Sequence, residues 1–311
     1  MKFQVEEVSI VEVGPRDGLQ NEKVSIPTDV KVDFITALVD AGLRTVEVGA
    51  FVHPKWVPQM ADTAEVYRQI PKDPGVDYPV LVPNLRGLER AIEVGVKSIS
   101  IFTAASDTFN RRNINMSIDE SFVNFAPVMD RARSEGLRVR GYVSCTLGCP
   151  YEGEVPPERV LEVAARLLDI GCYEVSIGDT IGVGTPLQVQ GLIGLLLQVI
   201  PPSKLAMHFH DTRGTALANT LAALEMGIAT FDASAGGLGG CPYAPGASGD
   251  LATEDLVYLL NGLGIPSGVD LDRLVAASKV IAPHIDHPLP GKVLQASNPK
   301  APQPLSGSSV Q

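Results

Sequence analysis

Two histidines one residue apart end a short apolar run, and their spacing suggests metal chemistry. Residues 205–211 read Leu-Ala-Met-His-Phe-His-Asp, so the pair is His208 and His210. Side chains on an extended strand alternate between its two faces, which directs both imidazoles to one side. The pair could bind a metal ion, or it could be a structural or solvated pair. Carboxylates converging on the same end of the fold would favour the metal.

The composition narrows the class of protein. The chain has 311 residues and a net charge of −11, which argues against a nucleic-acid surface because phosphate binding needs clustered Lys and Arg. Glu6 and Glu7 interrupt the start where a secretory signal would be apolar, and the longest apolar window, residues 191–200, is too short to span a bilayer. We expect a cytoplasmic protein with a small substrate and no membrane contact.

An αβ repeat organises the chain. Helical patterns that end at a Gly precede β-branched runs, for example at Gly42, Gly95, Gly171 and Gly227. Strands are predicted at 8–13, 45–49, 79–82, 98–102, 138–145, 174–178, 205–210 and 230–234. Helices are predicted at 29–41, 58–69, 86–94, 117–134, 157–168, 187–199, 215–226 and 253–261. Eight alternating units predict an α/β protein, a (β/α)8 TIM barrel.

The end of the chain completes this organisation. Residues 1–297 are expected to form one domain, in which an extra C-terminal helix at 271–281 packs outside the barrel. Residues 298–311 are rich in Pro, Ser and Gly and are expected to be disordered.

In such barrels chemistry gathers at the C-terminal ends of the strands, and several charged residues fall there. Arg16 and Asp17 follow the first strand, although they could be a surface ion pair. Glu47 interrupts an apolar strand, where a charge is costly unless it is paired or functional. Asp179 ends another strand and could instead cap the following helix. Asp17 and the histidines are thus expected at one rim.

A glycine-rich loop, residues 236–250, follows the last strand and suits a lid over a ligand. Its Cys241 could transfer a proton, whereas Cys145, Cys149 and Cys172 are expected to be buried. A metal held by His208, His210, Asp17 and an oxygen of Asp250 would favour Mg²⁺ or Mn²⁺ over Zn²⁺. Arg16 could then stabilise an enolate, which suits cleavage or formation of a carbon-carbon bond next to a carbonyl.

Several long motifs make this chain resemble the 3-hydroxy-3-methylglutaryl-CoA (HMG-CoA) lyase family, metal-dependent barrel lyases related to the isopropylmalate and homocitrate synthases. The motifs are GPRDGLQNE at 14–22, PKWVPQM at 54–60, RGYVSC at 140–145, LGCPYEG at 147–153, GDTIGVGTP at 178–186 and the glycine loop through 257. The likeness extends from about residue 8 to residue 263.

The resemblance implies a mechanism. Asp17, His208 and His210 would bind the cation, and Arg16, Glu47, Cys241 and His208 would be catalytic, with Arg16 on the enolate oxygen and Cys241 in proton transfer. The family cleaves a tertiary 3-hydroxyacyl-CoA: the 3-hydroxyl loses its proton, carbons 2 and 3 separate, and acetyl-CoA leaves as an enolate. HMG-CoA would give acetoacetate, a step of leucine degradation. A homodimer is also implied.

The chain departs from the family pattern near the barrel mouth. Asp250 stands where the lyases have a ligand Asn, and residues 50–53 read Ala-Phe-Val-His. Arg213 and Thr215 replace a Tyr and a Gln, and Arg213 could offset the charge of Asp250 or bind a substrate carboxylate. The preferred acyl group could therefore differ from methylglutaryl.

The sequence contains few indications of the residues that contact CoA. Arg111, Arg112 and Asn113 could meet its phosphates, or the two arginines could simply be solvated; Asp179 is a further candidate for substrate binding. Three other functions remain open: a synthase that condenses a 2-oxo acid with acetyl-CoA, a metal-dependent aldolase, and an inactive barrel used for binding.

Overall fold

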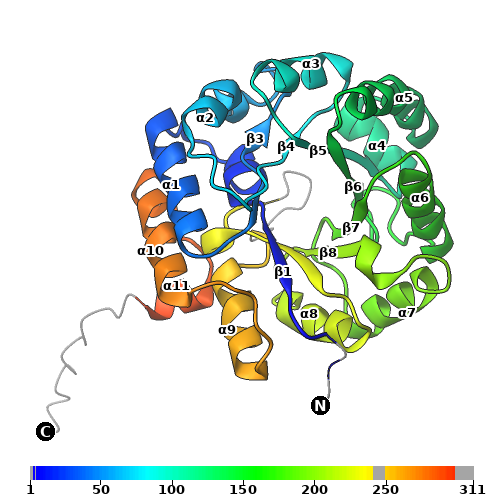
Figure 1. Cartoon of the computed structure of the whole chain (residues 1–311). Coiled ribbons are helices and arrows are strands. Elements are labelled where there is room, and N and C mark those ends of the chain that lie inside the picture. Colours follow the sequence, from blue (N-terminus) through cyan, green and yellow to red (C-terminus); the bar gives the residue numbers. More distant parts are fainter. Residues whose placement is uncertain (1–2, 4, 241–248, 298–311) are drawn as a thin grey trace, which may run out of the picture.

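The computed structural model describes residue 3 and residues 5–240 and 249–297, which form a barrel of parallel strands surrounded by helices (Figure 1). The order of strands around the described sheet is β2-β1-β9-β8-β7-β6-β5-β4-β3. The strands are β1 Ser9–Glu12, β2 Thr45–Val46, β3 Gly49–Ala50, β4 Val80–Leu81, β5 Ser98–Ala104, β6 Arg138–Ser144, β7 Glu174–Asp179, β8 Leu205–Phe209 and β9 Thr230–Ala233. The predicted α/β barrel is confirmed.

The second predicted strand, residues 45–49, is present as two short segments, and it closes the barrel. β2 and β3 lie at the two ends of the strand order, yet only Glu47 and Val48 separate them in the chain. The N–H of Glu47 donates to the carbonyl of Glu12 (2.8 Å), whereas that of Val48 donates to Pro79 on the opposite side (3.0 Å). The same stretch thus joins both ends of the sheet, which removes exposed strand edges.

The helices cover the outside of the barrel, and most of the predicted ones are observed. They are α1 Thr28–Asp40, α2 Thr63–Gln69, α3 Leu85–Glu93, α5 Ile118–Ser134, α6 Pro157–Asp169, α7 Pro186–Leu196, α8 Ala216–Glu225, α9 Thr253–Leu263 and α10 Leu271–Ile281. The predicted helix at 58–69 is interrupted: one turn, Pro58–Met60, precedes α2. The extra helix α10 packs beside α1.

Two helices were not expected, α4 Asp107–Ile114 and α11 Lys292–Ala296. α4 is largely polar, so no apolar periodicity marks it, but Ser106 caps it by accepting the N–H of Phe109 (3.1 Å). No helix in the described residues combines the length and apolar character needed to cross a membrane. The tail at 298–311 lies outside the described residues.

The barrel interior is polar, whereas the layer between strands and helices is apolar. On β6, Val139 and Val143 join the hydrophobic core, but Arg140 reaches Asp232 on β9 (2.7 Å). Because β6 and β9 are not neighbours in the sheet, this contact crosses the interior. Cys145, Cys149 and Cys172 are buried as expected. The strands thus direct a set of polar side chains toward one another inside the barrel.

Candidate functional site

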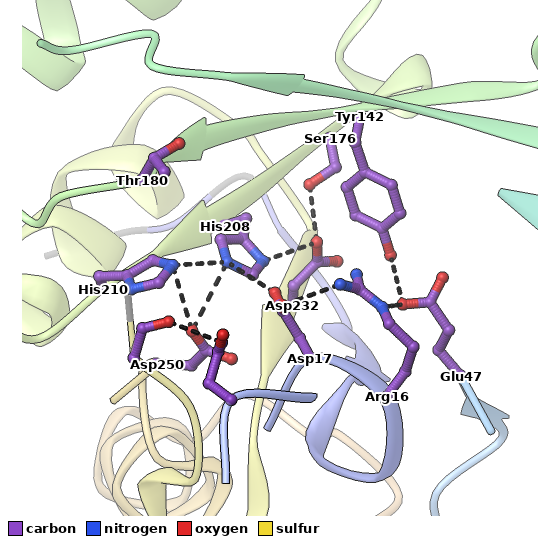
Figure 2. Close-up of polar contacts among 12 residues, drawn as sticks. Arg16, Asp17, Glu47, Tyr142, Ser176, Thr180, His208, His210, Asp232 and Asp250 are labelled. Carbon is purple, nitrogen blue, oxygen red and sulfur yellow. Dashed lines mark hydrogen bonds and ion pairs between the residues drawn. The ribbon is translucent and has the colours of Figure 1, made fainter. Parts of the chain in front are cut away.

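The four predicted metal ligands form one cluster at the C-terminal ends of the strands (Figure 2). Nε2 of His208 lies 3.2 Å from Nε2 of His210 and 3.7 Å from carboxylate oxygens of both Asp17 and Asp250. Oδ1 of Asp250 is also 3.2 Å from Nε2 of His210. The alternation predicted from the sequence is therefore correct: both imidazoles lie on one face, beside two carboxylates.

A tight turn positions Arg16 and Asp17. After β1 the amides of Arg16, Asp17 and Gly18 all donate to the carbonyl of Val13, at 3.1, 2.7 and 3.2 Å. Gly14 at the start of the turn leaves room for the Glu12 carboxylate, because a Cβ there would lie 2.6 Å from Oε1 of Glu12. This turn holds the side chains of Arg16 and Asp17 above the C-terminal end of β1.

Backbone pairing places Asp250 beside His210. The N–H of Asp211 donates to Gly249 (3.0 Å), and that of Leu251 donates to Phe209 (2.9 Å), so the end of the glycine loop lies antiparallel to the end of β8. A Cβ on Gly249 would come within 1.8 Å of the carbonyl of Gly237, so only glycine fits there. This pairing brings together His210 and Asp250, which are forty positions apart in the sequence.

The cluster has the donor set and the unsatisfied atoms of a cation site. Ligand atoms of His208, His210 and Asp250 all lie within 4.8 Å of one another. Oδ2 of Asp250 and Nδ1 of His210 are buried without a hydrogen-bond partner among the described residues, and Oδ1 of Asp250 has the two imidazoles as neighbours but makes no hydrogen bond. Buried carboxylate oxygens are rarely left so, because desolvation is costly. A divalent cation would satisfy the oxygens of Asp250, so these residues fit a metal ion.

The pKa values of the cluster are strongly perturbed. Burial lowers the pKa of His208, but Asp232, Asp250 and Asp17 outweigh burial and raise it to about 9. Burial and the neighbouring His208 lower the pKa of His210 to about 3. Burial and Asp17 raise the pKa of Asp250 to about 8. Ionisable groups forced so close together in a buried site are typical of functional sites.

Arg16 and Glu47 form a second buried pair beside the cluster. Nε of Arg16 lies 2.5 Å from Oε2 of Glu47, and its NH1 lies 2.8 Å from Oδ1 of Asp17. Glu47 also accepts hydrogen bonds from Ser100 (2.7 Å) and Tyr142 (3.3 Å). Burial alone would lower the pKa of Arg16, but the two carboxylates raise it well above its usual value. The fixed positive charge of Arg16 therefore lies beside the cation cluster, which comprises the proposed metal ligands Asp17, His208, His210 and Asp250.

The sequence analysis missed four residues of the barrel interior: Arg140, Tyr142, Ser176 and Asp232. Asp232 accepts hydrogen bonds from Arg140 and Ser176, both at 2.7 Å, and its Oδ2 lies 3.2 Å from Nδ1 of His208. Each of the four is a polar residue that is followed on its strand by an apolar residue or a glycine. That signal, which identified Glu47, could have identified them as well.

The remaining predicted residues lie apart from the cluster or have other partners. Asp179 is buried and accepts the N–H groups of Val183 (3.0 Å) and Gly184 (2.8 Å), so it holds the loop after β7. Burial raises its pKa, although these hydrogen bonds oppose the shift. NH1 of Arg213 donates to the carbonyls of Ile181 (3.0 Å) and Gly182 (2.9 Å).

The basic residues of α4 are exposed. Arg111 pairs with Asp107 (2.9 Å) and Glu120 (3.3 Å), and the guanidinium of Arg112 lies 4.4 Å from the ring centroid of Tyr151. Asn113 lies on the same helix. Cys241 lies outside the described residues.

Comparisons with known proteins identify relatives over nearly the whole chain. The family model described as HMGL-like matches residues 7–281. The mitochondrial hydroxymethylglutaryl-CoA lyase of Rattus norvegicus is 56% identical over 290 residues, which cover 93% of this chain and 89% of the relative. The cytoplasmic 3-hydroxy-3-methylglutaryl-CoA lyase of the same species is 55% identical and covers 94% of this chain and 85% of its own length.

Solved structures agree with the sequence comparisons. The hydroxymethylglutaryl-CoA lyase of Pseudomonas aeruginosa superposes with a TM-score of 0.93 at 52% identity and covers 96% of this chain and 99% of its own. An HMG-CoA lyase of Acinetobacter baumannii, solved with coenzyme A and 3-methylmalate, has a TM-score of 0.91 at 37% identity over 98% of this chain and 100% of its own.

Proposed function

Because the chain belongs to the HMGL-like family and is a carbon-carbon lyase, we propose that it cleaves HMG-CoA to acetoacetate and acetyl-CoA. The observation that carries the proposal is the largely buried cluster of Asp17, His208, His210 and Asp250 beside Arg16, in a chain that is 56% identical to a named HMG-CoA lyase. Leucine degradation would be its metabolic setting.

Asp17, His208, His210 and Asp250 would hold a divalent cation. The two carboxylates suit Mg²⁺ or Mn²⁺, the cations proposed here, whereas imidazoles are also common ligands of Zn²⁺. The bound cation would polarise substrate oxygens as a Lewis acid. Asp250, in place of the family's Asn, adds a negative charge that would strengthen attraction for the cation and weaken its Lewis acidity.

Arg16 would stabilise the negative charge that develops when the carbon-carbon bond breaks. Its guanidinium is held by Asp17 and Glu47 and lies 5.4 Å from the ring centroid of Tyr142. A cation fixed in advance needs little reorganisation as an enolate oxygen forms, which is the basis of electrostatic catalysis.

Proton transfer would involve Glu47, His208 and Cys241. The 3-hydroxyl of the substrate must lose a proton, and the enolate of acetyl-CoA must gain one. Glu47 lies in a hydrogen-bonded network with Ser100 and Tyr142, which could pass a proton without exposing it to bulk water. Cys241 is assigned the second transfer by its position in the family motif.

An acyl-CoA substrate is supported by the relative solved with coenzyme A and 3-methylmalate. On α4, Arg112 is the better candidate for a CoA phosphate, because two carboxylates already engage Arg111. Arg213 donates to backbone carbonyls, which supports a structural role rather than binding of a substrate carboxylate. The departure at Arg213 thus gives no reason to prefer a different acyl group.

An assay of acetyl-CoA release from several 3-hydroxyacyl-CoA thioesters tests the proposal. With Mg²⁺ or Mn²⁺, HMG-CoA should be cleaved faster than every related thioester, and a chelator should abolish cleavage. Faster cleavage of another thioester would replace the substrate but keep the mechanism. Condensation of a 2-oxo acid with acetyl-CoA, in the absence of any cleavage, would instead identify a synthase.

Location and assembly are further parts of the proposal. We assign the protein to the cytoplasm as a homodimer; relatives named as cytoplasmic and as mitochondrial are equally similar to it. Light scattering coupled to gel filtration should give twice the monomer mass. A mass equal to that of the monomer would overturn the dimer.

A further inference from the structure

Asp232 joins the cation cluster to a buried arginine. Its Oδ1 accepts a hydrogen bond from NH2 of Arg140 at 2.7 Å. Its Oδ2 accepts one from Ser176 at 2.7 Å and faces Nδ1 of His208 at 3.2 Å (Figure 2). All three side chains that meet at this carboxylate come from different strands, and Asp232 itself is 1% exposed.

The contact network continues to the opposite end of the barrel. Nε of Arg140 donates to Oε1 of Glu174 at 2.7 Å, and Glu174 is the first residue of β7. Arg140 is thus placed between two carboxylates, and it is 1% exposed. Because an arginine cannot be deprotonated in a protein, the carboxylate of Asp232 lies against a permanent positive charge.

The position of the Asp232 carboxylate beside Nδ1 determines which nitrogen of His208 carries the proton. A carboxylate only accepts hydrogen bonds, so Nδ1 of His208 must donate to it. In the neutral ring, Nε2 then has the lone pair, and Nε2 is the nitrogen that faces Asp17 and Asp250. A metal ligand needs this arrangement, since the second ring nitrogen of a ligating histidine usually donates to a carboxylate or carbonyl.

We propose that Asp232, held by Arg140 and Ser176, is a positioning residue that fixes the ring orientation and tautomer of His208 for cation binding. The inference rests on the proposed function, because it assumes that the cluster binds a divalent cation. In this role Asp232 would act through its contact with His208 and would not itself be a ligand of the cation.

A second carboxylate of the barrel, Asp77, provides a control with similar partners but a side chain that is 21% exposed. Asp77 accepts hydrogen bonds from Ser98 (2.8 Å) and from Arg138 (3.2 Å), so its partners are of the same types as those of Asp232. Ser98 and Arg138 begin β5 and β6, which places Asp77 at the end of the barrel opposite the cation cluster. Asp77→Asn therefore alters a carboxylate that, like Asp232, has a serine and an arginine as partners, but that has no histidine partner in the described part of the chain.

Direct binding of Mn²⁺, measured by calorimetry without substrate, tests the proposal. Asp232→Asn should weaken binding about 10- to 100-fold, the usual effect of losing the partner of a ligating histidine. Ser176→Ala leaves the charge in place and should weaken binding about fivefold or less. Asp77→Asn should bind Mn²⁺ as the wild type does.

The outcomes separate the inference from the proposed function. Wild-type protein that binds no Mn²⁺ would overturn both. Wild-type and Asp232→Asn proteins that bind Mn²⁺ equally would overturn only the positioning role, as would an equal loss in Asp77→Asn. A fall in kcat with an unchanged Mn²⁺ affinity would also count against it.

A measurement on the wild type remains decisive if Asp232→Asn does not fold. Nitrogen-15 NMR of the Mg²⁺-loaded protein, with the His208 signals assigned from the difference to a His208→Gln spectrum, reports the tautomer. A proton on Nδ1 of His208 is expected. A proton on Nε2 would overturn the proposal.

Discussion

Two arginines of this molecule make ion pairs of nearly equal length in different surroundings. Arg16 lies 2.8 Å from Asp17 at the C-terminal end of the barrel, and Arg111 lies 2.9 Å from Asp107 on the surface of α4. The side chain of Arg16 is 8% exposed, whereas that of Arg111 is 55% exposed. Water and salt screen the surface pair, so its contribution is small despite its distance. Burial, rather than the length of the ion pair, therefore distinguishes the charged side chains that can take part in catalysis.

The largest expected effect comes from replacing the buried arginine. Arg16→Gln removes the fixed cation from the place where the enolate charge would form, so kcat should fall at least about 10²- to 10³-fold. Arg111→Gln is the matched surface change and should leave kcat unaltered. Steady-state kinetics with HMG-CoA check both, with circular dichroism to confirm folding. If kcat fell equally in the two variants, burial would not explain a difference between the two arginines.

Cation binding should stabilise the fold through the buried cluster. At a Mg²⁺ concentration 100 times the Kd, the free energy of unfolding should rise by about 2.7 kcal/mol, and a chelator should reverse the gain. Asp250→Ala removes one proposed ligand and should lose most of this gain. Urea denaturation with and without Mg²⁺ measures it. If Asp250→Ala retained wild-type Mg²⁺ affinity, Asp250 would not be a ligand.

Buried and exposed carboxylates should also differ in how they change the pH dependence of the free energy of unfolding. Burial raises the pKa of Glu12 to about 7, although Thr253, Ala235 and Gly14 donate hydrogen bonds to it. A folded-state pKa above the unfolded value means that the folded protein binds more protons between about pH 4.5 and 7. The contribution of Glu12 to stability is therefore full below this window and decreases as pH rises through it.

Glu12→Gln is neutral at every pH and should remove that dependence. Between pH 5 and pH 8 the stability of the variant relative to wild type should rise by an amount on the order of 2 kcal/mol. Glu120, fully exposed on α5, is the control, and Glu120→Gln should show no such difference. Urea unfolding at several pH values provides the measurement. Parallel pH profiles for wild type and Glu12→Gln would contradict this expectation.

The smallest effect is expected on α4. Arg112→Ala would remove one exposed phosphate contact and should raise KM for the acyl-CoA a few-fold with kcat unchanged, since exposed ion pairs contribute about 0.2–1 kcal/mol. Arg111→Ala should change KM less, because Asp107 and Glu120 already engage that side chain. An increase in KM for Arg111→Ala alone would reverse the assignment on this helix.

Much of the site could be predicted because its signals are local. The alternation of side chains along residues 205–210 places His208 and His210 on one face whatever surrounds them. The rule that barrel chemistry gathers at the C-terminal ends of strands then selects Arg16, Asp17 and Glu47 from one pass along the chain. The cluster in Figure 2 contains each of these residues.

The sequence by itself determined the eight-unit repeat, the side chains that share a strand face, and the turn that carries Arg16 and Asp17. Only the tertiary structure decided that Arg140 meets Asp232, a residue 92 positions away, and that the pairing of Gly249 and Leu251 with β8 places Asp250 beside His210. Periodicity and turn chemistry act over a few residues, so they can be read locally. Contacts across the barrel depend on closure of the sheet, which brings distant strands within hydrogen-bonding distance only when the whole fold has formed.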